Sequence, residues 1–535
     1  MPTFYDFVIV VLSLGLFKFV GDLISARRQN NPPIPPGPTR YPFVGSFLSI
    51  PTSTPWKTYV RWSQEHNSDL VAVRAFGQVS IIVNTKKAAK ELFERRSAVY
   101  ADRPQMMMAD LMGWGVATTL SPYSDQWRAQ RKILHHSLNA TASATYHPMH
   151  LAKVELVLRS LYLDPEAYLG HIRHYAASMA MLIAYGYDVD PKEDRLVDVA
   201  EKAVNMISNA MFPGAMAVNA VPMRSSSHLC ILSPPRLILS TLDVVRHLPD
   251  WFPGTGFKQY AKQCMALTTE MWEAPFAFAK RSIAEGTAPP SLASAHIEMN
   301  DARGGGAHGE KMIKYALGTL FSAAADTTVS AITTGILGLT VYPAVLLRAQ
   351  AELDRVVGRR RLPTFKDRPS LPYITALCRE ILRWQVILPL ALAHCPTKDD
   401  VYEGMFIPKG SPVLLNAWAI LHDPEDYPDP EAFKPERFLT ADGTLNDDEV
   451  QAAFGLGRRN CVGMHMGNDS VWITMASIIS IFNISKAKDE HGNEIPVEAV
   501  STDEAVSHPV PFQCSIRPRD SEAEELLQQL GRDTM

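Results

Sequence analysis

The chain has 535 residues, of which 46% are hydrophobic and 20% charged, with a formal net charge of -4 at pH 7. This composition is typical of a globular protein with a large core, and the lack of a basic excess argues against nucleic-acid binding. The six cysteines are scattered without a C-x-x-C pair. That pattern argues against a disulfide framework or a structural zinc site and favours a reducing compartment.

Residues 1–26 contain a mostly apolar stretch, from Phe4 to Ile24, that predicts an N-terminal transmembrane helix, because about 20 apolar residues cross a bilayer core. Arg27 and Arg28 follow directly, so the positive-inside rule places the remainder of the chain in the cytosol. A cleaved signal peptide is the alternative, which is disfavoured because no small-residue cleavage site follows a short apolar core. We therefore expect a single-pass membrane anchor.

Residues 27–40 are rich in proline, most densely from Pro32 to Pro38. Proline fixes φ and removes backbone donors, so this hinge is expected to be a stiff, extended spacer. It would separate the anchor from the main domain, which we place over residues 41–519.

That domain begins with two short strands, predicted around residues 71–74 and 79–84. Long helical patterns dominate the rest of the sequence, so the predicted fold class is mainly α (α+β), with small peripheral β-sheets. Residues 520–535 are polar and rich in glutamate, which predicts a frayed helical tail.

Trp127 and Arg131 lie four residues apart in a helical run, and therefore on one face of the helix. This W-x-x-x-R spacing is a weak signal by itself, because amphipathic helices often carry such a pair by chance.

A long apolar helix is predicted from Met312 to Val341, after a flexible glycine-rich break at residues 304–308. Asp326 and Thr327 interrupt its apolar surface. A carboxylate and a hydroxyl within an apolar helix are costly unless they are bonded or functional. A threonine hydroxyl can also bond to the carbonyl four residues earlier and open the helix locally.

Glu380 and Arg383 form an E-x-x-R pair at the helical spacing that lets side chains meet. An exposed pair of this kind contributes only about 0–1 kcal/mol. A structural role for this pair is supported by a second motif downstream, Phe433 to Phe438, which contains Arg437.

The most informative stretch is residues 454–463, which follow the pattern F-x-x-G-x-R-x-C-x-G. Gly457 and Gly463 permit tight turns and close backbone approach, so the loop is suited to presenting the thiolate of Cys461. Arg459 supplies a fixed positive charge for a carboxylate of a bound cofactor. The apolar stretch from Met464 to Ile484 predicts a helix that starts at the loop. An ordinary glycine turn with a buried cysteine is the alternative.

These matched positions resemble the haem-binding signature of the cytochrome P450 family. The resemblance covers nearly the whole chain, with the motifs in the expected order, and it implies the P450 fold. Two positions depart from the family pattern: Ala324 stands where glycine is usual, and Gly467 where alanine is usual.

Residues 221–238, without helical or strand period, look inserted relative to fungal relatives. They are either an elaboration of the lid or an unspliced intron, which sequencing of the transcript would distinguish.

The resemblance also implies roles for individual residues. Cys461 would be the axial thiolate ligand of the haem iron, a ligand that favours O–O cleavage. Trp127, Arg131 and His394 would contact the haem propionates, although a structural role for His394 is nearly as well supported. Asp326 and Thr327 would relay protons to iron-bound dioxygen.

Glu380, Arg383 and Arg437 would form the buried structural triad that the family places in its core.

The implied activity is that of a monooxygenase that inserts one oxygen atom of O2 into a hydrophobic small molecule. Short stretches of the sequence resemble family members of fungal secondary metabolism. This resemblance favours a hydroxylation of a terpenoid, polyketide or indole. The chain has no flavin or nicotinamide fingerprint, so the electron donor would be a separate NADPH-cytochrome P450 reductase. We expect a monomer that is anchored in the endoplasmic reticulum membrane, faces the cytosol and binds no nucleic acid.

Apolar residues of the expected substrate lining are Met106–Met108, Leu111–Trp114, Phe321 and Ile387–Leu392. Two other functional classes stay open at this point. One is a haem-thiolate isomerase or dehydratase, against which the Asp326–Thr327 pair counts. The other is a non-catalytic haem-binding protein, which NADPH-dependent turnover with a reductase would exclude.

Overall fold

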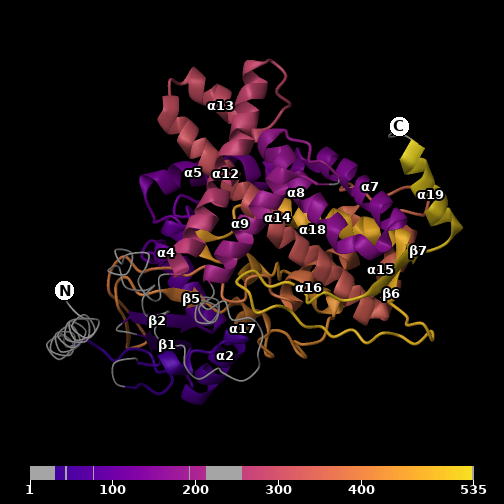
Figure 1. Ribbon diagram of the computed structural model, residues 1–535. Helices are drawn as coiled ribbons and strands as arrows, with labels where there is room; N and C mark the ends of the chain where they lie inside the picture. Colours follow the sequence, from indigo (N-terminus) through magenta and orange to yellow (C-terminus); the bar gives the residue numbers. More distant parts are fainter. Residues whose placement is uncertain (1–30, 42–44, 76–77, 192, 212–255, 533–535) are drawn as a thin grey trace.

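The computed structural model describes residues 31–41, 45–75, 78–191, 193–211 and 256–532. Over this part of the chain the protein is a mainly helical body with small sheets at its periphery (Figure 1), as the sequence predicts. The expected anchor, the beginning of the hinge and the suspected insertion at residues 221–238 lie outside the described residues.

The helices of the N-terminal half are α2 (Pro55–His66), α3 (Lys86–Ala89), α4 (Met107–Leu111), α5 (Asp125–Leu138), α6 (Ala140–Ala144), α7 (His147–Leu163), α8 (Tyr168–Tyr185) and α9 (Arg195–Met211). Those of the C-terminal half are α12 (Gly256–Ala284), α13 (Leu292–Ala302), α14 (Gly306–Val341), α15 (Pro343–Val356), α16 (Pro372–Trp384), α17 (Ala417–Leu421), α18 (Met464–Ile481) and α19 (Ser521–Arg532).

Helix α14 runs through the middle of the body (Figure 1) and packs against α5, α8, α16 and α18. It begins at Gly306, so the glycine-rich segment is partly helical rather than a complete break. Each interior glycine costs a helix only about 1 kcal/mol, which the buried packing of the following turns offsets. Among the described residues, α14 is the one helix long and apolar enough to cross a membrane, but 67% of its apolar window is buried inside the fold.

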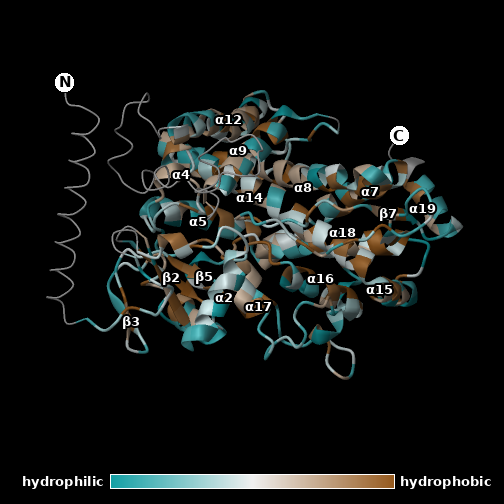
Figure 2. Cartoon of the chain, turned by 60° about the horizontal axis from the view of Figure 1, so that its bottom comes forward, coloured by the Kyte–Doolittle hydropathy of each residue, from teal (hydrophilic) through white to brown (hydrophobic). Residues whose placement is uncertain are grey.

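The sheets are small. Strands β1 (Leu70–Ala75) and β2 (Gln78–Val83) pair antiparallel, which confirms the predicted strand pair, and β5 (Val413–Leu415) joins β2 in parallel. The other two sheets are the hairpin of β3 (Asp400–Tyr402) and β4 (Met405–Ile407) and the pair of β6 (Phe482–Lys486) and β7 (Cys514–Pro518). Figure 2 shows hydrophobic residues on the strands of the first sheet and hydrophilic residues along α19 at the surface.

The described part of the proline-rich hinge is docked on the domain. Its Pro36 carbonyl accepts a hydrogen bond of 2.8 Å from Ala72 N on β1, and its Pro33 carbonyl accepts one of 2.8 Å from Phe406 N on β4. A Cβ added at Gly37 would lie 2.0 Å from the Ala72 carbonyl oxygen. The segment is therefore extended, as predicted, but it is attached to two sheets instead of standing clear of the domain.

Replacing Gly37 with alanine should separate the hinge from β1. We expect the variant to lose about 1–3 kcal/mol of stability, the range for forced overpacking, as a lower midpoint of urea unfolding. Gly170→Ala in α8 is the matched control, because a Cβ there meets no atom within 4 Å and alanine is the better helix former. Equal midpoints for the two variants would contradict this reading of the close approach.

The C-terminal tail is not frayed, contrary to the sequence-based expectation. Residues Ser521–Arg532 form α19, and the side chains of Ala523 and Leu527 are buried. The Tyr162 hydroxyl of α7 donates a hydrogen bond of 2.6 Å to Glu524. Two small apolar contacts at helical spacing are enough to dock an otherwise polar helix.

Candidate active site

The loop that carries Cys461 consists of a short helical turn, Gly457–Arg459, followed by the start of α18. Gly457 has φ +66, and a Cβ there would lie 1.8 Å from the Phe93 carbonyl oxygen. The Cys461 N–H donates a hydrogen bond of 2.7 Å to the Phe454 carbonyl. The predicted helix after the loop is confirmed, although it ends at Ile481 because β6 begins at the next residue.

The Cys461 side chain is exposed, whereas the helix that follows it is largely buried. Desolvation by the surrounding chain raises the pKa of the thiol, and this effect is opposed by the Gly463 N–H, which donates to the sulfur, and by the charge of Arg131. Both opposing contacts favour the anionic form. The sulfur is therefore accessible to a bound group, and these two contacts favour its thiolate form even though desolvation keeps the pKa of the Cys461 thiol above its ordinary value.

The two predicted arginines meet at this loop. The Arg131 guanidinium on α5 donates hydrogen bonds of 2.7 Å to the Asn460 carbonyl and 2.8 Å to the Asn460 Oδ1 atom. Arg459 is buried, and its guanidinium donates to three carbonyls that belong to Ala101, Thr118 and Ser121. In this structure, then, Arg131 ties the loop to α5, and Arg459 ties it to the segment before α5.

A third arginine, Arg103, was not singled out from the sequence as a site residue. It is buried, and its guanidinium donates to the carbonyls of Thr119, Leu392 and Ala393. Desolvation lowers the pKa of Arg103 to about 9, assisted by the charges of Arg459 and Arg131 and opposed by Asp102. The only indication in the sequence was the stretch Tyr100 to Pro104, and nothing in that stretch shows that Arg103 is buried.

Taken together, three guanidinium groups lie within electrostatic reach of one another, and two of them, Arg103 and Arg459, interact with the carboxylate of Asp102. Desolvation also lowers the pKa of Arg459, to about 10. Buried charges need compensation, so this cluster suits a cofactor with anionic groups on its edge.

Trp127 lies beside this cluster. Its indole Nε1 donates a hydrogen bond of 3.1 Å to the Thr118 carbonyl, and its ring lies 4.2 Å from the Arg459 guanidinium carbon. The donor expected to contact a propionate is thus bonded within the protein here. In this structure the Trp127 ring makes a cation–π contact that holds the Arg459 side chain in place.

His394 is also close to the arginines. Its Nδ1 lies 2.8 Å from the Tyr100 carbonyl, and its ring packs at a tilt against Phe93 with centroids 4.5 Å apart. Desolvation, with the charges of Arg103 and Arg459, lowers the pKa of His394 to about 3. The imidazole is therefore neutral, with its proton on Nδ1, and Nε2 would serve an anionic cofactor only after taking up a proton.

Asp326 and Thr327 lie on α14, which is buried on both sides of residues 323–328. Within that run Ala323 is exposed and the other residues are half-buried. The Thr327 Oγ1 donates a hydrogen bond of 2.8 Å to the Ala323 carbonyl, the back-bond foreseen for this residue. The Asp326 Oδ1 atom lies 3.0 Å from Nε2 of His508, a contact that the sequence did not indicate. The middle of the central helix therefore offers an accessible strip of three alanines, one acid and two alcohols, Thr327 and Thr328.

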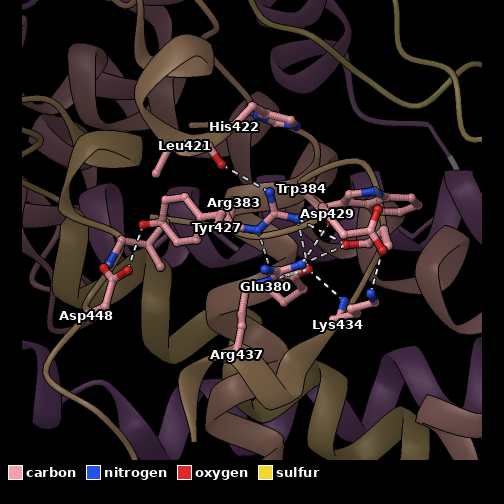
Figure 3. A network of polar contacts seen from close by, with 12 residues as sticks. Glu380, Arg383, Trp384, Leu421, His422, Tyr427, Asp429, Lys434, Arg437 and Asp448 are labelled. Carbon is pink, nitrogen blue, oxygen red and sulfur yellow. Dashed lines mark hydrogen bonds and ion pairs between the residues drawn. The ribbon is translucent and has the colours of Figure 1, made fainter. Parts of the chain in front are cut away.

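The predicted structural triad is present (Figure 3). Arg383 and Glu380 are both fully buried, and the Arg383 Nε and Nη2 atoms donate hydrogen bonds of 2.6 and 2.9 Å to the carboxylate. Arg437 adds a third bond of 3.2 Å, and the Lys434 backbone N–H adds one of 2.7 Å. This network ties α16 to the segment that leads to the Cys461 loop.

A cavity of about 580 Å³ lies between the first sheet and α4. Its lining includes Met106–Met108 and Leu111, as expected, together with Pro389–Leu392 from the expected range 387–392. Phe321 and, from the expected range Leu111–Trp114, Met112 and Trp114 are buried in the core and do not line it. Asp110 and Glu504 are the charged residues among the described lining.

A family model for cytochrome P450 matches residues 35–229 and 237–515 of the chain. The chain belongs to the cytochrome P450 family. Cytochrome P450 monooxygenase 208 of Postia placenta is 39% identical to it over 505 residues, which cover 94% of this chain and 93% of the relative. A tryptamine 4-monooxygenase of Psilocybe cyanescens is 35% identical over 520 residues, covering 96% and 98% of the two chains. The match to the family model skips residues 230–236, which lie within the suspected insertion.

This P450 is therefore a monooxygenase whose cofactor is haem with an axial thiolate. The residues of the site fit that group: an accessible sulfur at Cys461, an excess of buried guanidinium charge beside it, and the accessible strip on α14. When bound, haem supplies the activation of dioxygen, and the thiolate donates electron density to it.

Proposed function

We propose that this P450 hydroxylates a hydrophobic small molecule of fungal secondary metabolism, of the terpenoid, polyketide or indole class. The observation that supports the substrate class most directly is the cavity of about 580 Å³, whose lining is dominated by methionine, leucine, proline and alanine. Pockets of this size and polarity suit small apolar ligands, and methionine side chains adapt to irregular shapes. The two compared relatives are fungal, and one is named for an indole amine.

Each site residue has a role in this proposal. Cys461 ligates the iron, and Arg131 and Arg459 provide positive charge for the propionates while bracing the ligand loop. Trp127 holds Arg459, and His394 joins the same edge when protonated. Asp326 and Thr327 hold the protons that dioxygen cleavage consumes, at the carboxylate and at Oγ1.

The proposal includes a membrane-bound NADPH-cytochrome P450 reductase as electron donor, since P450 monooxygenases need one and no flavin or nicotinamide fingerprint is found in this chain. It also includes a monomeric enzyme on the cytosolic face of the endoplasmic reticulum, held by residues 1–26.

The test is to incubate the full-length protein and reductase with NADPH, heavy-isotope O2 and a panel of terpenoids, polyketides and indoles. We expect one heavy oxygen atom in a product whose formation requires both NADPH and the reductase. A product formed without O2 would instead establish an isomerase or dehydratase, and no product from a correctly folded haem-thiolate protein would exclude these substrate classes.

Replacing Thr327 with alanine should keep haem binding but uncouple the reaction. Without the hydroxyl, proton delivery is less efficient, and we expect peroxide released per NADPH to rise several-fold, since a positioned proton-transfer group contributes about 10²–10⁴-fold to the rate of the step it serves. Thr340→Ala is the matched control, since the Thr340 hydroxyl makes the same back-bond, 2.8 Å to the Ile336 carbonyl, far along the same helix. Equal peroxide yields from both variants would count against the relay role of Thr327.

A further inference from the structure

The carboxylate of Asp326 has a partner from a distant part of the chain. Its Oδ1 atom lies 3.0 Å from Nε2 of His508, and the two side chains are 23% and 24% exposed. His508 belongs to the turn that precedes β7, whereas Asp326 lies in the middle of α14. The contact is thus a tertiary one, at the only acid of the accessible strip over residues 323–328.

The turn that carries His508 is fixed by hydrogen bonds. The His508 N–H donates to the Thr502 hydroxyl at 3.1 Å, and the Thr502 N–H donates to the His508 carbonyl at 2.7 Å. Ser507 binds on either side of the turn, with its N–H 2.8 Å from the Ile387 carbonyl and its carbonyl 2.6 Å from the Ser330 hydroxyl of α14.

Ser330 lies four residues after Asp326, so both side chains are on one face of α14. The helix therefore holds the turn at two successive points: a hydrogen bond from the Ser330 hydroxyl to the Ser507 carbonyl, and the side-chain contact between Asp326 and His508. A histidine held this way has few alternative positions, which distinguishes the contact from a surface ion pair of two mobile side chains.

Other charges face the same carboxylate. Glu201 on α9 is near enough that the charge of Asp326 contributes to raising the pKa of Glu201, after the larger effect of desolvation, while Arg173 on α8 acts in the opposite direction. With a second acid nearby, a partly buried Asp326 would turn toward solvent unless something held it. The His508 contact supplies that restraint through one oxygen, which leaves Oδ2 for proton exchange.

We propose that His508 is a positioning residue for proton delivery: it holds Asp326 through Oδ1 in the orientation from which Asp326 serves Thr327. This inference rests on the proposed proton-handling roles of Asp326 and Thr327.

The test uses the full-length, haem-loaded protein and four variants: His508→Leu, His508→Gln, Asp326→Asn and the double variant His508→Leu/Asp326→Asn. Thermal unfolding midpoints measure whether the two side chains interact at all. We expect the shifts of the two single variants to be non-additive in the double variant, as for residues in direct contact. Additive shifts would overturn the pairing, whatever the enzyme does.

The second readout is the rate of NADPH oxidation with the reductase, for variants whose reduced, carbon-monoxide spectrum shows intact haem ligation. We expect His508→Leu to slow NADPH oxidation roughly tenfold, less than the about 10²–10⁴-fold that a proton-transfer group itself contributes, because Asp326 is kept, and to add nothing in the Asp326→Asn background. His508→Gln should recover most of the rate, because its amide N–H can donate from the position of Nε2.

Three results would overturn the proposal: an unchanged rate in His508→Leu, a glutamine variant as slow as the leucine variant, or a further slowing in the double variant. If Asp326→Asn is as fast as the wild type while the unfolding midpoints remain non-additive, the proposed role of Asp326 fails and the pairing stands. The two failures are therefore distinguishable.

Discussion

Replacing Cys461 with serine is expected to abolish the long-wavelength Soret band of the reduced, carbon-monoxide-bound protein and all NADPH-driven oxygen insertion. The serine hydroxyl cannot supply the electron-donating sulfur through which Cys461 would hold the haem iron. The loop itself should survive, because its hydrogen bond from residue 461 to the Phe454 carbonyl comes from the backbone. A difference spectrum in microsomes, recorded at equal amounts of expressed protein, measures the effect.

Cys514→Ser is the matched control. Cys514 is a partly exposed free cysteine on β7, and burial raises the pKa of its thiol to about 12. Cys514 belongs to the β6–β7 pair and not to the loop of residues 454–463, so the control variant should keep the band. A Cys461→Ser protein that retained the long-wavelength band would remove Cys461 as the ligand.

Replacing Glu380 with glutamine is expected to cause the largest loss of stability. The change leaves the guanidinium of Arg383, which is 0% exposed, without its carboxylate. Breaking a buried ion pair by removing one partner costs about 3–5 kcal/mol. We expect a lower midpoint of urea unfolding and a smaller fraction of protein with the thiolate spectrum, because the triad connects α16 to the segment before the Cys461 loop.

Glu436→Gln provides the comparison within the same region. Glu436 pairs with Arg348 at 2.8 Å, but the two side chains are 44% and 53% exposed. A pair of this kind contributes about 0–1 kcal/mol, so this variant should unfold near the wild-type midpoint. If Glu380→Gln were no less stable than Glu436→Gln, the triad would have no special structural role.

Much of the candidate site could be predicted because its residues belong to short sequence motifs. The Cys461 loop, the Glu380–Arg383 pair and the Asp326–Thr327 pair each combine residues that are close in sequence, with spacings that follow from helix and turn geometry. The strand pair at the start of the domain and the long central helix were predictable for the same reason, since their apolar periods are local.

The parts that were missed depend on tertiary packing. Arg103 is an unremarkable arginine until its complete burial beside two other guanidinium groups is seen. His508 gave no signal, since its partner lies on another element far along the chain. The tail was misjudged from its polar composition, although Ala523 and Leu527 stand at the spacing of one helix face.

The position of the His508 turn also has a consequence for biosynthesis. Both Cys461 and His508 lie near the C-terminal end of the sequence, whereas Asp326 and Arg103 are translated long before them. A nascent chain can therefore build most of its helical body before it can ligate iron, and it completes the acid–imidazole contact only when the last sheet closes. Chains cut short between these two points by a premature stop codon or proteolysis would carry the iron ligand without the partner of Asp326.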